Sequence, residues 1–254
     1  MHKIVFMGSD AIALPLLDWL HAHSASHGAA LVAVYSQPDR PKGRGKKLSP
    51  NPVSAWALDK GIALFRPEKP TSEDAAWLRE QGIDLALVMA YGHILRKSLL
   101  AVPPRGFVNF HASLLPKFRG ASPVESSVAT GEAETGVTLM EITPPMDEGP
   151  ACDVERVAIE PSDTGGSMRE KLAAACPALI ARNLTALLDG SATFIEQDHA
   201  SATYCRKLVK ADGALDFLAS AKTLVARING LDPWPGCFAD HGETRLKLRG
   251  AAWE

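Results

Sequence analysis

Short apolar runs alternate with longer amphipathic stretches along the first half of the chain. Four runs have mostly apolar interiors, which is typical of parallel strands buried on both faces; they are 3–7, 31–35, 84–89 and 106–110. Helical spacing between them predicts helices over 11–21, 51–60 and 72–81. Pro52, Glu73 and Asp74 are ordinary helix-start signals. The alternation predicts an α/β fold, with a Rossmann-like, open and mostly parallel sheet and flanking helices.

The second half of the chain changes from extended to helical patterning. The predicted elements are two strands and one long amphipathic helix, over 136–142, 151–159 and 164–188. Ser162 or Thr164 can cap this helix, and Asp189 with Gly190 can close it. Pro177 lies inside it, so we expect a kink or a break into two helices.

The most informative polar residues follow the fourth apolar run. Asn109 and His111 are two residues apart, so a strand presents both on one face, and Asp147 stands in the turn between the two later strands. An Asn amide can donate to a developing oxyanion, a His can stabilise an intermediate or move its proton, and a carboxylate can orient the His ring. Together these groups predict acyl transfer through a tetrahedral intermediate. Ser113 lacks the Gly-x-Ser-x-Gly setting of a nucleophile, and an amine acceptor requires none.

Composition indicates a globular enzyme and excludes several other classes. The 254 residues are 46% hydrophobic, enough for one large domain and a smaller one. A net charge of −2 gives no overall attraction to nucleic acid, so any such attraction must be local. The four cysteines have no zinc-like spacing, and neither a secretory signal nor an apolar run of membrane length is evident, so we expect a cytoplasmic protein without metal. We also expect a monomer. Gly8 follows the first strand without the further glycines of a dinucleotide site.

A basic segment follows the second predicted strand. Within eight residues, and with no acid among them, it carries Arg40, Lys42, Arg44, Lys46 and Lys47 among glycines and a proline. Such a stretch predicts an exposed, flexible arm. It could be a solvated surface loop, or it could reach RNA phosphates.

Several of these motifs together resemble a known family. Residues 109–120 (NFHASLLPKFRG), 121–123 (ASP), 134–138 (ETGVT) and the Asp147-x-Gly149 pair resemble the formyltransferases that use 10-formyltetrahydrofolate. Residues 37–48 (QPDRPKGRGKKL) resemble the group within that family that formylates methionyl-tRNA. The resemblance runs in order from Ile4 to Trp234. It implies transfer of the formyl group of 10-formyltetrahydrofolate to the α-amino group of methionyl initiator tRNA, for translation initiation, with no metal.

The resemblance also implies which residues form the site. Asn109, His111 and Asp147 correspond to the catalytic trio, and His93 is not expected to be catalytic. The folate pocket is expected to be lined by Met89, Ala90, Tyr91, Gly92, Ile94, Leu95, Ser113, Leu114, Leu115 and Pro116. The tRNA contacts are expected from Arg40, Lys42, Arg44, Lys46 and Lys47, with Arg44 as the most important.

Two other functions remain open from the sequence. One is a formyltransferase for a small amine, of the sugar nucleotide or glycinamide ribotide type, or a formyltetrahydrofolate hydrolase; in either case the basic segment would be idle. The other is a tRNA-binding remnant without activity. Unchanged activity after neutralising the basic segment would favour the first, and tRNA binding without turnover would favour the second.

The resemblance predicts two domains and a linker. The catalytic domain is expected over 1–190, the linker over 191–206, and an incomplete C-terminal tRNA-binding domain over 207–254. In the family this second domain continues as an OB-like barrel, whereas the sequence here ends after about two of its strands. Two strands cannot close a barrel. We therefore expect either a truncated chain or a short tail that packs on the first domain.

Overall fold

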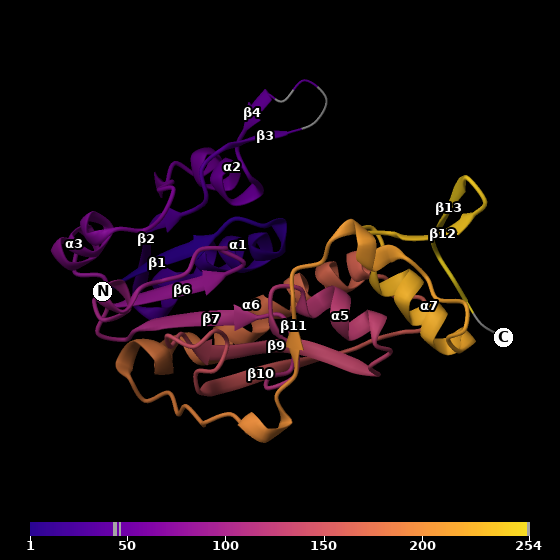
Figure 1. The fold of residues 1–254 in the computed structure, drawn as a ribbon. Helices are drawn as coiled ribbons and strands as arrows, with labels where there is room; N and C mark the ends of the chain where they lie inside the picture. Colours follow the sequence, from indigo (N-terminus) through magenta and orange to yellow (C-terminus); the bar gives the residue numbers. More distant parts are fainter. Residues whose placement is uncertain (43–44, 46, 253–254) are drawn as a thin grey trace. The chain divides into compact units, whose positions relative to one another are not determined.

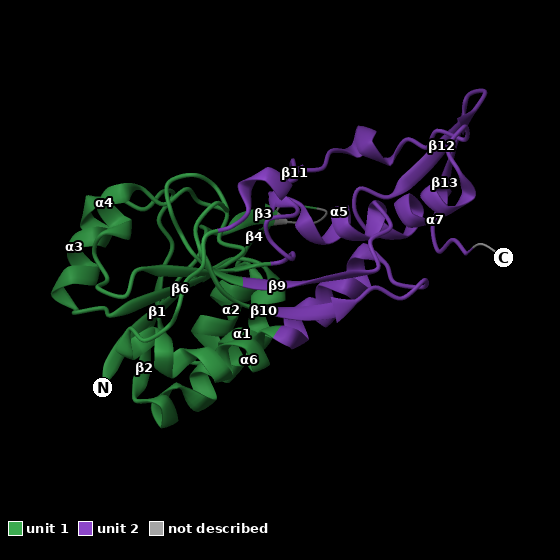
Figure 2. Ribbon diagram, turned by 90° about the horizontal axis from the view of Figure 1, so that it is seen from below, with its two compact units in different colours: residues 1–111, 139–153, 176–196 green, residues 112–138, 154–175, 197–254 purple. Residues whose placement is uncertain are grey.

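The computed structural model of the protein describes residues 1–42, 45 and 47–252. The chain forms two compact units, and each unit is assembled from three separate segments (Figure 2). Unit 1 contains residues 1–111, 139–153 and 176–196, and unit 2 contains 112–138, 154–175 and 197–254.

A seven-stranded sheet, in the order β10-β9-β7-β6-β1-β2-β5, organises unit 1 (Figure 1). Its five parallel strands are β1 (His2–Gly8), β2 (Ala29–Tyr35), β5 (Ala63–Phe65), β6 (Leu85–Met89) and β7 (Phe107–His111). The remaining strands, β9 (Glu134–Glu141) and β10 (Ala151–Ala158), each continue from one unit into the other. All five residues of β6 are buried, as its uninterrupted apolar sequence requires. The prediction of a Rossmann-like, mostly parallel sheet is confirmed.

Unit 1 contains four α-helices among its described residues, besides the second half of the long helix described below, and two of the four begin at a residue whose side chain caps them. The four are α1 (Leu14–His23), α2 (Pro52–Asp59), α3 (Ser72–Glu80) and the short α4 (Lys97–Leu100). The Asn51 side chain accepts a hydrogen bond from Ser54 N at 2.9 Å and so caps α2. Thr71 and Asp74 form a capping box at the start of α3.

The long helix α6 (Gly165–Asp189) is continuous through Pro177, so the predicted break into two helices is wrong. Its cap is at Thr164, one of the two predicted residues: Ser167 N donates to Thr164 Oγ1, and Thr164 N donates to Ser167 Oγ. Buried Cys176 and Leu179 adjoin the proline, and their packing holds the helix together there. By length and apolar composition α6 could cross a membrane, contrary to our expectation that no apolar run approaches membrane length. In the structure, 44% of its most apolar window is buried inside the protein.

Besides the first part of α6, the described residues of unit 2 form two complete α-helices and two small strand pairs. Helix α5 (Pro123–Ala129) packs against α7 (Ala221–Gly230), and β8 (Arg119–Gly120) pairs with β11 (Tyr204–Cys205). A Cβ on Gly230 would lie 2.3 Å from the backbone nitrogen of Ala129, so this helix contact requires glycine. Strands β12 (Cys237–His241) and β13 (Thr244–Leu248) form an antiparallel pair, as expected for a C-terminal β segment.

The basic segment is flanked by paired strands rather than by irregular loop. Strand β3 (Arg40–Lys42) and strand β4 (Lys47–Ser49) are antiparallel and form a hairpin between β2 and α2 (Figure 1). We refer to residues 40–49 as the basic hairpin. Two of its predicted RNA contacts, Arg44 and Lys46, lie outside the described residues.

Candidate functional site

Asn109 and His111 lie at the carboxyl end of β7, and Asp147 approaches them from the loop between β9 and β10. All three belong to unit 1. Asp147 Oδ1 is 3.6 Å from His111 Nδ1, and their side chains are 15% and 6% exposed. Asn109 pairs in register with Val88 of β6, so the site sits at the carboxyl ends of two neighbouring parallel strands. Open α/β sheets bind ligands at this edge.

The Asp147 loop owes its shape to two unusual backbone positions. Asp147 has φ of 56°, in the left-handed region, which Asp tolerates better than most residues. Gly149 is buried, and a Cβ there would lie 2.0 Å from the carbonyl oxygen of Glu141. The loop closes through a hydrogen bond from Glu141 N to Pro150 O at 2.9 Å. The Asp147-x-Gly149 spacing therefore turns the loop and directs the carboxylate toward His111.

Asn109 is half-buried, and its amide is available to a ligand. Among the described residues, no protein group forms a hydrogen bond with this side chain. An amide held on a strand can donate to an oxygen that gains negative charge, and the neighbouring imidazole can stabilise or move a proton. The arrangement is therefore capable of the acyl-transfer chemistry that the sequence predicts.

The Ser113 side chain stabilises the local fold. It is fully buried, and its hydroxyl donates to Lys117 O at 2.6 Å. Its carbonyl accepts from Thr138 Oγ1, which in turn accepts from Leu115 N. The predicted folate residues 113–116 thus form part of a tightly bonded turn in unit 2, and the Ser113 hydroxyl has no features of a nucleophile.

The predicted folate segment 89–95 has a backbone that exposes polar groups. Ala90 and Gly92 have positive φ values of 50° and 77°. Among the described residues, no hydrogen bond engages the backbone of Gly92, Ile94 or Leu95. The Ile94 side chain is 81% exposed. The segment therefore offers backbone donors and acceptors beside an apolar side chain, as recognition of a polar heterocycle would need.

His93 lies in the same segment but plays a different part from His111. Its ring packs edge-on against Tyr91, with 4.9 Å between the ring centroids. Nε2 is buried and has no hydrogen-bond partner among the described residues. Burial lowers the pKa of His93 below its usual value; the neighbouring Glu68 opposes this shift, and Arg40 and Lys69 reinforce it. His93 is therefore a packed ring with a lowered pKa, and its lack of a catalytic role stays a prediction.

The described cations of the basic hairpin differ in their partners. Arg40 donates to Glu68 at 2.6 Å, although both side chains are more than half exposed. Lys47 is exposed on β4. In the part of the chain that the structure describes, Lys47 has no charged partner, whereas Glu68 partly compensates the charge of Arg40.

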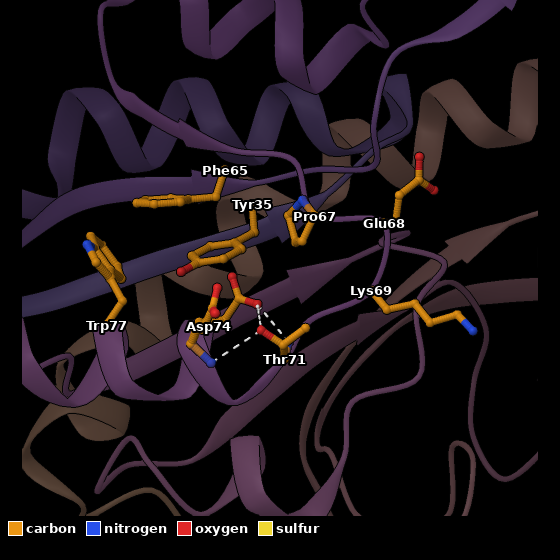
Figure 3. Close-up of a pocket in the computed structure, with 9 residues that line it drawn as sticks. Tyr35, Phe65, Pro67, Glu68, Lys69, Thr71, Asp74 and Trp77 are labelled. Carbon is orange, nitrogen blue, oxygen red and sulfur yellow. Dashed lines mark hydrogen bonds between the residues drawn. The ribbon is translucent and has the colours of Figure 1, made fainter.

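Unit 1 also contains a cavity of about 670 Å³. Figure 3 shows it between the aromatic side chains of Tyr35, Phe65 and Trp77 and the first turn of α3. Tyr35 and Phe65 stack with their centroids 4.8 Å apart, and the buried Tyr35 hydroxyl has no partner among the described residues. No member of the trio and no residue of 89–95 lines this cavity, so it is separate from the candidate site.

Arg119 is a structural centre that sequence reasoning missed, although it stands in the NFHASLLPKFRG motif. It is 1% exposed in unit 2. Its guanidinium donates twice to Gln197 Oε1, at 2.8 and 3.1 Å, and once to the Tyr204 hydroxyl, and it also contacts His199. Arg119 therefore holds the 197–205 segment in place.

In the described part of the chain, no group of three His, Cys, Asp or Glu residues could hold a metal ion.

Comparison with known proteins gives consistent matches over almost the whole chain. The family model described as formyl transferase matches residues 2–184, and the model for the formyl transferase C-terminal domain matches 207–254. A methionyl-tRNA formyltransferase of Marinobacter nauticus is 39% identical over 251 residues, which are 98% of this chain and 79% of that protein. One of Sorangium cellulosum is 40% identical over 250 residues, with the same two coverages.

A solved structure has the same fold. It is an N-formyltransferase of Helicobacter canadensis in complex with folinic acid and dTDP-3-aminofucose. The TM-score is 0.74 at 18% identity, and the match covers 97% of this chain and 87% of that one. At this identity the likeness establishes the fold alone.

Proposed function

The chain belongs to the formyltransferase family, and from that premise we propose that it transfers the formyl group of 10-formyltetrahydrofolate to the α-amino group of methionine on initiator tRNA. The observation that carries the proposal is the approach of Asp147 to His111. Asn109, two residues before His111 on β7, has a side-chain amide with no hydrogen-bond partner among the described residues. Relatives that bear this function in their names are 39–40% identical over 98% of the chain. We place the reaction in the cytoplasm, where translation begins.

In the proposed reaction, the amine of methionyl-tRNA attacks the formyl carbon of the folate. Asn109 donates to the formyl oxygen as it becomes an oxyanion, a contact that typically contributes about 2.7–4 kcal/mol. His111 stabilises the tetrahedral intermediate and manages its proton. Asp147 orients the His111 ring and helps to remove the proton of the incoming ammonium. Collapse of the intermediate breaks the bond from the formyl carbon to folate N10, and tetrahydrofolate leaves.

Substrate binding is proposed to use two further parts of the chain. Segments 89–95 and 113–116 bind the folate, and the described backbone groups of Gly92, Ile94 and Leu95 are available for it. The basic hairpin, with Arg44, Lys46 and Lys47 as its principal charges, contacts the tRNA. In sequence terms, 1–190 is the catalytic domain, 191–206 the linker and 207–254 the C-terminal tRNA-binding domain.

The direct test is transfer of labelled formyl from 10-formyltetrahydrofolate to methionyl initiator tRNA, with free methionine as a parallel acceptor. Product on the tRNA alone is the expected result. Absence of product on both acceptors, with folate still bound, would overturn the proposal and direct attention to a different amine.

A second variant set tests the role of the basic hairpin. Replacing Arg44, Lys46 and Lys47 together with Ala should raise KM for tRNA and flatten its dependence on salt concentration. Replacing three exposed cations elsewhere in unit 1, Lys60, Arg79 and Lys97, is the matched control. Equal effects of the two sets, or no effect of the first, would exclude the hairpin as the tRNA contact.

A further inference from the structure

Gln37 connects the basic hairpin to the folate segment. It directly precedes the Pro38-Asp39 approach to β3, and its side-chain Nε2 donates to Tyr91 O at 3.1 Å. Its backbone N donates to Ser9 Oγ at 3.0 Å, and Ser9 Oγ donates to the same Tyr91 carbonyl. One carbonyl in segment 89–95 is therefore held from two directions by residues at the root of the hairpin and at the end of β1.

The other end of the hairpin is tied to the same residue. Asn51, which caps α2 directly after the hairpin, donates from Nδ2 to Gln37 O at 3.0 Å. Asn51 Oδ1 also accepts from Ser36 Oγ at 2.9 Å. The chain before the hairpin, at Ser36 and Gln37, is thus joined to the chain after it by two side-chain hydrogen bonds of Asn51, one of which holds Gln37.

Gly92 leaves the space that Gln37 occupies. A Cβ on Gly92 would lie 2.4 Å from Gln37 Nε2, and the glycine φ of 77° is itself unfavourable for other residues. The backbone of segment 89–95 is therefore shaped to let the Gln37 amide approach. Ser9, Gln37 and Tyr91 follow β1, β2 and β6, which are neighbours in the sheet, so the contact lies at the carboxyl edge of the strands.

We propose that Gln37 is a positioning residue that sets the folate segment and the root of the tRNA-binding hairpin in one arrangement, so that both substrates depend on it. This inference rests on the proposed function, because it names Gln37 as the link between the two proposed binding segments. Gln37 is not a catalytic residue. Its loss should affect the binding of folate and of tRNA together and leave the chemical step largely intact.

The test uses Gln37→Glu in the full chain, because a carboxylate of the same shape cannot donate to the Tyr91 carbonyl. We expect KM to rise about two- to tenfold for both 10-formyltetrahydrofolate and methionyl initiator tRNA, the range for one lost hydrogen bond. The kcat value should stay within about twofold, since the effect concerns binding. Gln81→Glu, at an exposed glutamine after α3, is the matched control.

Ser9→Ala keeps the inference testable if Gln37→Glu does not fold. Because Ser9 and Gln37 hold the same carbonyl, Ser9→Ala and Gln37→Ala should each raise the same two KM values. The effect of the double variant should then differ from the sum of the two single effects. A rise in KM for only one substrate, a fall in kcat alone, or additive effects would overturn the proposal.

Equilibrium binding of folinic acid separates this inference from the proposed function. A wild-type chain that binds folinic acid but transfers nothing to tRNA would refute the function, and weaker folinic acid binding by Gln37→Glu would still be expected. Unchanged folinic acid binding in that variant would refute the role of Gln37 whatever the acceptor is.

Discussion

Asp147 reaches to within 3.6 Å of His111 Nδ1 from a left-handed backbone position, with φ of 56°. Asp147 therefore has to supply a carboxylate beside His111 and also to adopt a backbone conformation with positive φ. Asp and Asn both tolerate this conformation better than most other residues, so the carboxylate can be removed without disturbing the loop.

Asp147→Asn should therefore separate activity from stability. We expect kcat to fall by about 10²–10⁴-fold, because the amide cannot accept a proton or hold His111 in the same way. The thermal midpoint should change little, since Asn accepts the left-handed conformation. Formyl transfer and a thermal melt of the same preparation check both statements, and a large loss of thermal stability would show that Asp147 acts mainly through the fold.

Asn109→Ala should lower kcat by about 10²–10³-fold through loss of an oxyanion donor. Folinic acid should bind nearly as well as before, because the donor acts on the charge that develops during the reaction. Steady-state kinetics and equilibrium binding measure the two effects separately. Equal losses of binding and turnover would instead assign Asn109 to ground-state folate recognition.

Glu68→Gln should strengthen tRNA binding. The change removes the anion that pairs with Arg40 and leaves one more uncompensated cation on the basic hairpin. We expect KM for tRNA to fall at low salt and the difference to disappear as salt screens the charge. Glu80→Gln, at the exposed end of α3, is the control. An increase in KM would mean that the ion pair organises the hairpin for binding.

Arg119→Met should destabilise the protein by about 2–4 kcal/mol, because it leaves buried Gln197 and the Tyr204 hydroxyl without their charged donor. Urea unfolding measures the change. The comparison is Arg245, an exposed arginine that pairs with the carboxylate of Asp240; Arg245→Met should cost far less. Similar losses for the two variants would contradict the structural role assigned to Arg119.

His93 should make the protein less stable in mild acid. Burial lowers its folded-state pKa below the ordinary histidine value of about 6.5, so the unfolded chain binds the proton more readily. Its contribution is favourable above about pH 6.5 and decreases as the pH falls from there toward the lowered pKa. Wild type should therefore lose stability relative to His93→Gln between pH 7 and pH 5. Urea unfolding at several pH values tests this, with the exposed His241→Gln as control.

The predicted and observed folds agree where burial alone decides the structure. Strands such as β6, which are apolar on both faces, were found from the sequence within one or two residues. Strand β5, which is only three residues long, and helix α7 are not among the predicted elements. Helix α6 continues through Pro177 because packing outweighs one missing hydrogen bond. Helix propensities read from neighbouring residues in the sequence cannot predict that packing.

The candidate site was predictable in composition but not in geometry. Asn109, His111 and Asp147 stood out by residue type and resemblance, yet the approach of Asp147 depends on Gly149 and the closure of its loop. Arg119 could not be recognised as buried, because its partner Gln197 is 78 residues away. The described bonds of Gln37 were invisible for the same reason: they join segments that only the sheet brings together.

The interleaved composition of the two units has a consequence for synthesis. The chain passes between the units at residues 111, 138, 153, 175 and 196, so neither unit is a continuous stretch. The last segment of unit 1 includes Ile195, whose backbone pairs with Ala151. While it is being made, the nascent chain therefore cannot complete unit 1 until residue 196 has left the ribosome. The two earlier segments of unit 1, residues 1–111 and 139–153, therefore remain incompletely packed until the segment 176–196 is available.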